Sequence, residues 1–460
     1  MNKIQSKQWR SNCRERSSIH MKKIFILTLF FYSIIVLNAQ SNVDALLREG
    51  ITSLTNRQYD KAILNFKQVT SLQPTNADAY YNMGVAYANL GNVNSAIENY
   101  SKTIKYNPKK TEAYINRGSA YSELKQFKEA LADYNKAIEL NSKMSETYNN
   151  RGYLFSLQSM HVEAIKDFDK AITLNPKYSK AYINKAFSSS SIGEHQLAIE
   201  ILSKLISIDP DYSPAYFNRA LEYKELNDNK NALKDYDKAL ELEPNDENLL
   251  VLRAEVRDEL GDDKGAIEDC TTLIKLNPTN PKSYYIRARA QYDIPNYQAV
   301  VDDCSQAIKI KPDYWEAFII RGNAFDFIGK YEEALKDYNK AIELNPKVTD
   351  AYEQRAIARL AKSDITGALS DLSRAILIAP KDLKLIEKRA ILRTASKDHK
   401  GAIDDYSKII DLEATSAKIF MARAELYLLQ GSNEKACDDY KRAEALGNGA
   451  AMSKRIFNCK

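Results

Sequence analysis

The sequence predicts an all-α protein, an α-solenoid of about twelve helix-turn-helix repeats closed by a C-terminal capping helix. Nine of the twelve prolines lie on one 34-residue grid, small residues recur at two fixed places in each period, and glycine recurs between those places. A fixed period of this size is typical of a stacked repeat array. The prolines on the grid are Pro74, Pro108, Pro176, Pro210, Pro244, Pro278, Pro312, Pro346 and Pro380.

The grid divides the chain into three parts. If the proline is position 32 of each repeat, twelve repeats start at residues 43, 77, 111, 145, 179, 213, 247, 281, 315, 349, 383 and 417. A leader then occupies 1–40, the array 41–450 and a cap 451–460. The composition, 44% hydrophobic and 28% charged, argues against wholesale disorder and against a multi-span membrane protein.

Each repeat is expected to be a helical hairpin. Position 8 is always Gly or Ala and position 20 is Ala in eleven repeats, so two helices can approach closely. Glycine at position 15 in five repeats predicts a left-handed C-cap on the first helix, and the proline ends the second. Aromatic residues at positions 4, 11 and 24 would fill the space around the helix contact. A single hairpin cannot bury its apolar face, so the hairpins must stack.

This pattern resembles the tetratricopeptide repeat (TPR) family, which has an aromatic at 4, small residues at 8 and 20, an aromatic at 24 and proline at 32. The stretch from Ala113 to Gly118, followed by Ala130 and Tyr134, is representative. The resemblance covers almost all of the chain after the leader. It implies a right-handed superhelix in which the first helix of each pair, helix A, lines a concave groove. Members of the family usually bind peptides or protein surfaces, and the repeat itself has no catalytic activity.

Two charged positions vary together. Position 7 is Arg and position 23 is Asp in the same nine repeats, from Arg117 with Asp133 to Arg423 with Asp439. We expect these side chains to form a structural ion-pair ladder between the two helices; the alternative is a set of ligand-binding charges. Repeat five has Lys185 at position 7 without an Asp at 23.

A row of asparagines is the main candidate binding feature. Position 6, which faces the groove in the family, is Asn in five consecutive repeats, and the run resembles the asparagine ladder in the tetratricopeptide superhelix of O-linked N-acetylglucosamine transferase. An amide both donates and accepts hydrogen bonds, so such a row can hold an extended peptide by its backbone. The alternative is a solvated polar helix face. The row is Asn82, Asn116, Asn150, Asn184 and Asn218.

In repeats seven to nine, positions 5 and 6 become apolar. This change predicts either an apolar groove segment that takes a partner helix or tighter packing between repeats. The candidate residues are Leu252, Tyr285, Ile286, Ile319 and Ile320.

Four cysteines follow the leader. Cys270 and Cys304 fall at interior position 24 and are expected to be core thiols. Cys437 and Cys459 lie at equal distances from Asn448, in a Gly-Asn-Gly turn signal. An antiparallel hairpin about that turn would bring them side by side, so we expect a disulfide that closes the cap.

The leader explains the positive charge. The chain has 66 basic and 61 acidic residues, a formal net charge of +5, but the first 39 residues hold seven bases and one acid, so the remainder is near neutral. A basic start, the apolar run 24–37 and a small residue after it predict a signal peptide and an exported protein, either periplasmic or secreted into the cell envelope. The alternative is an uncleaved N-terminal anchor, in which case the protein contacts the membrane.

We therefore expect a non-catalytic protein–protein interaction scaffold with a peptide or protein partner in the groove. The alternative is a structural or assembly component of a larger cell-envelope complex. The chain contains no HExxH, GxSxG or phosphate-binding glycine loop, so no catalytic, cofactor-binding or metal-binding residue is expected. Nucleic acid is not an expected partner, because the near-neutral body offers no basic patch.

Overall fold

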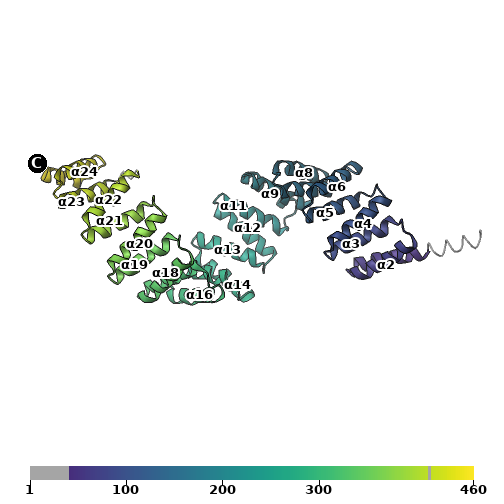
Figure 1. Ribbon diagram of the computed structural model, residues 1–460, viewed down its shortest axis with the longest axis horizontal. Helices are drawn as coiled ribbons and strands as arrows, with labels where there is room; N and C mark the ends of the chain where they lie inside the picture. The colour runs from purple at the N-terminus through teal and green to yellow at the C-terminus, as the bar shows by residue number, and fades with distance from the viewer. Residues whose placement is uncertain (1–40, 413–415, 460) are drawn as a thin grey trace, which may run out of the picture. The chain divides into compact units, whose positions relative to one another are not determined.

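The computed structural model describes residues 41–412 and 416–459, and within these ranges every regular element is helical (Figure 1). The predicted leader, 1–40, lies outside them. The chain divides into two compact units, Met1–Leu226 and Asn227–Lys460. The boundary falls inside repeat six, between its two helices. None of the described helices combines the length and apolarity needed to cross a bilayer.

The first unit contains the helices of repeats one to five and the A helix of repeat six. A first helix covers residues 41–55 of the described range. It is followed by α2 (Tyr59–Leu72), α3 (Ala77–Asn89), α4 (Val93–Tyr106), α5 (Thr111–Glu123), α6 (Phe127–Leu140), α7 (Ser145–Leu157), α8 (His161–Leu174), α9 (Ser179–Ser191), α10 (His195–Ile208) and α11 (Ser213–Glu225).

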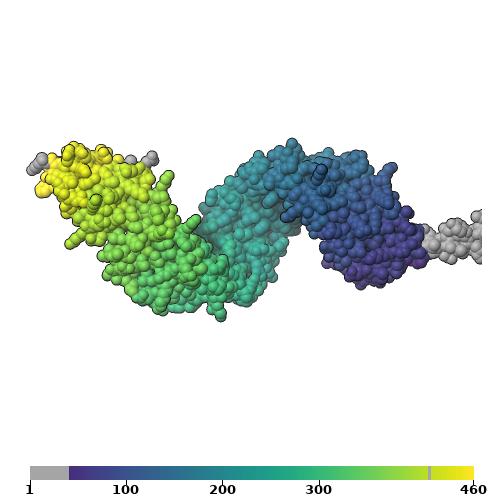
Figure 2. All heavy atoms as spheres, in the orientation of Figure 1, coloured from purple at the N-terminus to yellow at the C-terminus, as the bar shows by residue number. Residues whose placement is uncertain are grey.

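The second unit contains the rest of the array and the cap. Side chains fill the space between neighbouring helices within each unit (Figure 2). The helices of the second unit are α12 (Asn229–Leu242), α13 (Glu247–Glu259), α14 (Asp263–Leu276), α15 (Pro281–Asp293), α16 (Tyr297–Ile310), α17 (Trp315–Phe327), α18 (Tyr331–Leu344), α19 (Thr349–Ala361), α20 (Ile365–Ile378), α21 (Leu383–Ala395), α22 (His399–Asp411), α23 (Ala417–Leu429), α24 (Asn433–Ala445) and α25 (Gly449–Asn458).

The turn between helices A and B has the same left-handed residue in both units. Gly91, Gly193, Gly261, Gly329 and Gly431 have φ between 72° and 83°, as position 15 was expected to have. Non-glycine residues such as Lys125, with φ 58°, occupy the same position in other repeats at a conformational cost of roughly 1–2 kcal/mol. The following N–H closes the helix end; for example, Gln126 N donates to the Tyr121 carbonyl at 2.8 Å.

Position 8 is small because an aromatic ring from helix B fills the space above it. A Cβ added at Gly118 would lie 2.9 Å from the Tyr134 ring, and one added at Gly84 would lie 2.5 Å from Tyr100. The rings of Tyr100 and Tyr134 are both 2% exposed. A glycine at 8 therefore lets a large residue at 24 enter the core between the paired helices.

The ion-pair ladder forms as expected. In eight of the nine Arg–Asp pairs predicted from the sequence, both residues belong to the same unit. In all eight, the guanidinium contacts both carboxylate oxygens. Arg117, for example, donates to Asp133 at 2.7 and 2.8 Å, and its third nitrogen donates to Ser101 of the preceding repeat at 3.0 Å. The Asp133 side chain is 7% exposed. Each arginine thus ties helix B of its own repeat to helix B of the repeat before. The eight pairs are Arg117–Asp133, Arg151–Asp167, Arg253–Asp269, Arg287–Asp303, Arg321–Asp337, Arg355–Asp371, Arg389–Asp405 and Arg423–Asp439.

Repeat five keeps the link between repeats but loses the link within the repeat. Lys185 lies 2.7 Å from Asp169, which is position 25 of the preceding repeat. A lysine has one compact charge where arginine has a planar fork, so it serves one carboxylate rather than two neighbours.

Position 11 lacks the expected aromatic residue in six of the twelve repeats, and in three of these six it is arginine. The sequence predicted an aromatic there, and in repeat three Tyr121 does lie 5.7 Å from the Arg117 guanidinium. In repeat ten the residue is Arg359, which donates to Asp371 at 2.7 Å and to the Gly367 carbonyl at 3.0 Å. A Cβ at Gly367 would lie 2.9 Å from the Arg359 Cδ. Glycine at position 19 therefore accompanies arginine at 11, and the same arrangement recurs with Arg257 and Gly265 in repeat seven and with Arg393 and Gly401 in repeat eleven.

The proline grid also has a bonding role. In five repeats the tyrosine hydroxyl at position 4 donates to the carbonyl of the position-32 proline of the preceding repeat. The pairs are Tyr114–Pro108, Tyr182–Pro176, Tyr216–Pro210, Tyr284–Pro278 and Tyr352–Pro346, at 3.0–3.4 Å.

Candidate functional site

The five asparagines of the predicted row lie on the A helices of the first unit, α3, α5, α7, α9 and α11. Position 6 is one residue before position 7, which is the ladder arginine in three of these five repeats, so each amide stands beside the packed seam rather than within it. All five side chains are partly buried. The row is therefore neither a core feature nor a fully solvated face.

The amide nitrogens of four of these asparagines are already used. Asn116 Nδ2 donates to the Tyr81 hydroxyl at 3.1 Å, and Asn184 Nδ2 donates to the Asn149 side chain at 3.0 Å. Both bonds join adjacent A helices. Asn82 and Asn218 instead donate to carbonyls of their own helices, at 2.9 and 2.7 Å.

The carbonyl ends of the same four amides are available as acceptors. Among the described residues, no donor contacts the side-chain oxygens of Asn82, Asn116, Asn184 and Asn218. In Asn150 the oxygen has a weak contact, 3.4 Å from Asn149 Nδ2. Because the nitrogens are held in place, four half-buried acceptors are oriented along the first unit.

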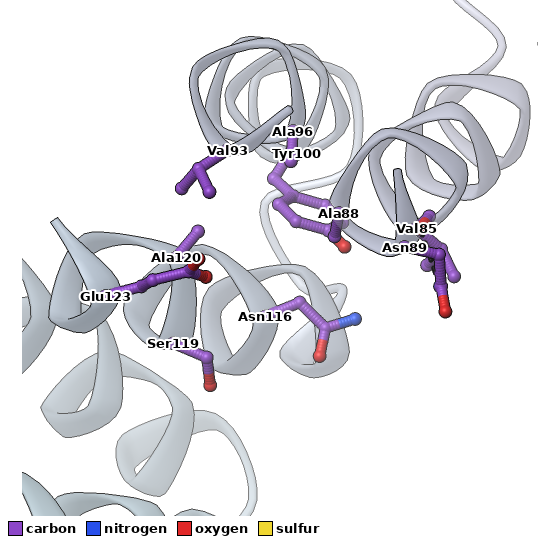
Figure 3. Close-up of a pocket in the computed structure, with 10 residues that line it drawn as sticks. All are labelled: Val85, Ala88, Asn89, Val93, Ala96, Tyr100, Asn116, Ser119, Ala120 and Glu123. Carbon is purple, nitrogen blue, oxygen red and sulfur yellow. Dashed lines mark hydrogen bonds between the residues drawn. The ribbon is translucent and has the colours of Figure 1, made fainter. Parts of the chain in front are cut away.

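A hollow of about 280 Å³ lies beside Asn116 (Figure 3). Its wall is made by α3, α4 and α5, with Asn116, Ser119 and Glu123 on α5 and the Tyr100 ring on α4. Burial raises the pKa of the Tyr100 hydroxyl, which keeps the ring neutral at physiological pH. The hollow is thus a small, partly apolar cavity with polar groups along one helix.

A second hollow, of about 770 Å³, lies beside Asn150 and shares Ser119 and Glu123 with the first. The Tyr134 hydroxyl at its base lies 3.1 Å from the Ser119 hydroxyl, and burial raises the pKa of Tyr134 to about 12. Tyr153 and Leu157 close its far side. Two adjoining hollows, each next to one asparagine of the row, therefore follow the A helices of repeats two to four.

The apolar residues predicted as a second groove divide into two groups. Ile286 and Ile319 are 1% and 4% exposed and belong to the core, so the packing alternative holds for these two. Leu252, Tyr285 and Ile320 are half-buried, and the Tyr285 ring lies 5.0 Å from that of Tyr314. The buried pair contradicts a continuous apolar groove here, because their side chains fill the contact between successive repeats.

An accessible apolar hollow, not predicted from the sequence, is instead found in repeats ten and eleven. It measures about 290 Å³. Ile357, Leu360 and Ile391, which line it, are 38–51% exposed. These residues occupy positions 9 and 12 of helix A, so apolar residues at those positions, rather than at 5 and 6, were the signal that could have found it.

The cysteines lie close to their expected places. Cys437 on α24 and Cys459 at the end of α25 have Cα atoms 5.7 Å apart, with the two sulfur atoms 2.02 Å apart. Cys270 and Cys304 are buried and free. Burial raises the pKa of the Cys270 thiol to about 12, so this thiol stays protonated and unreactive.

Comparison with known proteins identifies the repeat. Models described as tetratricopeptide repeat match residues 77–110, 111–144, 145–178, 213–246 and 315–348, and a further one matches 179–212. A model described as TPR repeat matches 57–91. The first group of matches begins at five of the predicted repeat starts. A comparison with curated proteins gave no significant match.

Solved structures with similar repeats include three that differ in extent. A crystal structure of MamA is 30% identical, with a TM-score of 0.33, over 35% of this chain and 95% of that one. Yeast Tom70 is 17% identical, with a TM-score of 0.40, over 90% and 99%. The C-terminal part of a TPR repeat-containing protein from Cytophaga hutchinsonii is 20% identical, with a TM-score of 0.44, over 52% and 97%.

Proposed function

Because the chain belongs to the tetratricopeptide-repeat family, whose members typically mediate protein–protein interactions, we propose that it is a non-catalytic scaffold that binds an extended peptide segment along the A helices of its first unit. The observation that carries the proposal is the row of oriented asparagine oxygens without donors. A buried or half-buried acceptor gains most from a partner that supplies an N–H group. An extended peptide backbone supplies such groups at regular intervals.

The spacing of helices and peptide supports this geometry. Packed helices lie roughly 8–10 Å apart. A polyproline-II chain rises about 3.1 Å per residue and returns to the same face every three residues, a repeat of roughly 9 Å. One asparagine per A helix therefore meets one backbone N–H per turn of such a peptide. The two hollows beside Asn116 and Asn150 would accept the side chains between these contacts.

A binding measurement tests the proposal. Peptides selected from a random library on the immobilised full-length protein provide ligands whose affinity is measured by fluorescence anisotropy. The triple variant Asn116→Ala, Asn150→Ala, Asn184→Ala is expected to bind them roughly tenfold or more weakly, since each lost hydrogen bond contributes about 0.5–1.5 kcal/mol.

The matched control changes three helix B residues of the same repeats: Lys136→Ala, Lys170→Ala and Lys204→Ala. It is expected to keep wild-type affinity. Undiminished binding by the asparagine variant would refute the groove and favour the alternative, a structural component of a larger assembly that uses other faces of the molecule.

We also propose that the protein is exported and that Cys437 and Cys459 are oxidised there. The basic and apolar leader supports export, and disulfides persist in oxidising compartments. A free-thiol count on protein recovered from the cell envelope tests both points. Equal counts before and after reduction would contradict them.

A further inference from the structure

Three aspartates meet at the junction of repeats seven and eight, on a part of the second unit remote in sequence from the asparagine row. Asp258 lies near the end of α13, Asp263 begins α14, and Asp293 ends α15. One carboxylate oxygen from each lies within 4.8 Å of the others. The helix ends of three consecutive helices thus bring three acidic groups to one point.

Asp258 is the buried member of this group, and one of its oxygens has no partner. Its side chain is 2% exposed, and Oδ2 accepts a charged contact from Arg289 at 2.6 Å. Oδ1 is buried and finds no hydrogen-bond donor in the described part of the chain, and the same holds for Oδ1 of Asp263. A buried carboxylate oxygen without a donor is costly, and such groups in native proteins usually bind a proton, a water molecule or an ion.

The local charge is also unbalanced. Three carboxylates face one guanidinium, that of Arg289, and Glu259 and Asp262 lie nearby. Burial raises the pKa of Asp258 to about 6; Arg289 opposes this rise, while Asp293 and Asp263 add to it. One guanidinium therefore faces three carboxyl groups at this point.

We propose that Asp258, Asp263 and Asp293 bind one calcium ion. Ca²⁺ prefers carboxylate and water oxygens at about 2.3–2.6 Å, so two oxygens on the same ion can lie up to roughly 5 Å apart. The three aspartate oxygens fall within that span. The ion offsets the excess negative charge and gives the orphaned Asp258 oxygen a partner, and water molecules complete the coordination on the open side at Asp293.

Aspartates at positions 12 and 17 of one repeat and position 13 of the next occur together in this sequence only at repeats seven and eight. Repeat nine also has an aspartate at position 12, Asp326, but the residues that correspond to Asp263 and Asp293 are Tyr331 and Ala361. The sequence predicted no metal site because the chain contains no metal-ligand motif such as HExxH; these three aspartates come from two repeats and fit no spacing motif. A bound ion would link the ends of α13, α14 and α15 and so stiffen this junction independently of peptide binding.

Calorimetric titration of the EDTA-treated full-length protein with CaCl₂ tests the site, with thermal unfolding as a second measurement. We expect one ion per chain with a Kd of about 10⁻⁴–10⁻³ M, typical of weak extracellular sites. Calcium should also raise the unfolding temperature, because it binds the folded state.

The variant Asp293→Asn, at the exposed ligand, is expected to fold normally and to bind Ca²⁺ roughly tenfold or more weakly. Asp326→Asn, at the same repeat position as Asp258, should leave calcium affinity unchanged. Absence of heat and of a thermal shift at about 10 mM CaCl₂, or wild-type affinity in Asp293→Asn, would overturn the proposal. Binding of MgCl₂ but not CaCl₂ would overturn the choice of ion.

Discussion

The two units build the same hollow from different side chains. In repeats two and three of the first unit, Asn116, Ser119 and Glu123 place polar atoms along a cavity of about 280 Å³. In repeats ten and eleven of the second unit, a cavity of about 290 Å³ is lined by Ile391 and Leu392, at positions 9 and 10 of helix A. The backbone repeat therefore places a hollow at corresponding positions of helix A. The side chains set its chemistry and its size, since the hollow beside Asn150 measures about 770 Å³.

The ladder beneath the hollows differs in a parallel way. In repeat three the ladder arginine, Arg117, is flanked by the rings of Tyr114 and Tyr121, at 5.9 and 5.7 Å. In repeat ten a second arginine, Arg359, replaces the ring at position 11 and shares Asp371 with Arg355. The face of an aromatic ring stabilises the arginine cation. A second arginine instead pairs one aspartate with two cations.

The largest expected effect comes from removing that shared aspartate. Asp371→Ala leaves the partly buried guanidinium groups of Arg355 and Arg359 without their carboxylate, and breaking one buried pair typically costs about 3–5 kcal/mol. Asp133→Ala leaves only Arg117 unpaired and should cost less. Urea unfolding of both full-length variants, read by helical circular dichroism, measures the difference. An equal or greater loss for Asp133→Ala would remove the distinction between the two kinds of rung.

A smaller effect is expected at the end of the second unit. A disulfide that closes the 22-residue interval between Cys437 and Cys459 adds roughly 3 kcal/mol to the free energy of unfolding, because it lowers the entropy of the unfolded chain. Reduction should therefore increase hydrogen exchange in α24 and α25. Exchange in α3 and α4 of the first unit, which lacks such a closure, serves as the internal control. Unchanged exchange at the C-terminal helices would mean that packing alone holds the cap.

The smallest effect on stability, and the most direct comparison of the hollows, comes from exchanging their side chains. Ile391→Asn should weaken binding of a hydrophobic fluorescent dye to the second unit, while Asn116→Ile should create dye binding in the first. Neither change should lower stability by more than about 1–2 kcal/mol, because Ile391 is half exposed and Asn116 loses one hydrogen bond. Dye titration followed by fluorescence measures both variants. Dye affinity that is unchanged by both substitutions would show that neither cavity binds the dye.

Much of the fold follows from the period alone. Every A helix from α3 to α23 begins at a predicted repeat start, and the Arg–Asp ladder was expected from the joint occurrence of its two residues. These features are predictable because each is repeated many times, so the pattern averages out individual exceptions. The division into two units was not predictable, since repeat six keeps the same pattern on both sides of the boundary.

The parts of the site that escaped prediction depend on single residues. Ile286 and Ile319 share an apolar character with Ile357 and Ile391, yet the first pair is buried and the second exposed. The exposure of each isoleucine depends on which turn of helix A it occupies, and the composition of the sequence does not reveal this. The aspartates of the proposed calcium site were missed for a related reason, because their proximity depends on how three helix ends meet.

The bond from the position-4 tyrosine to the preceding proline, which forms at five junctions, has an evolutionary consequence. Donor and acceptor belong to neighbouring repeats, as in Tyr182 and Pro176, so neither is satisfied within one copy. Duplication of a 34-residue repeat that has both residues, such as 179–212, reproduces the bond at the new junction. An insertion of another length breaks one and misaligns the ladder below it. The gene can therefore lengthen or shorten this protein in whole repeats at little structural cost.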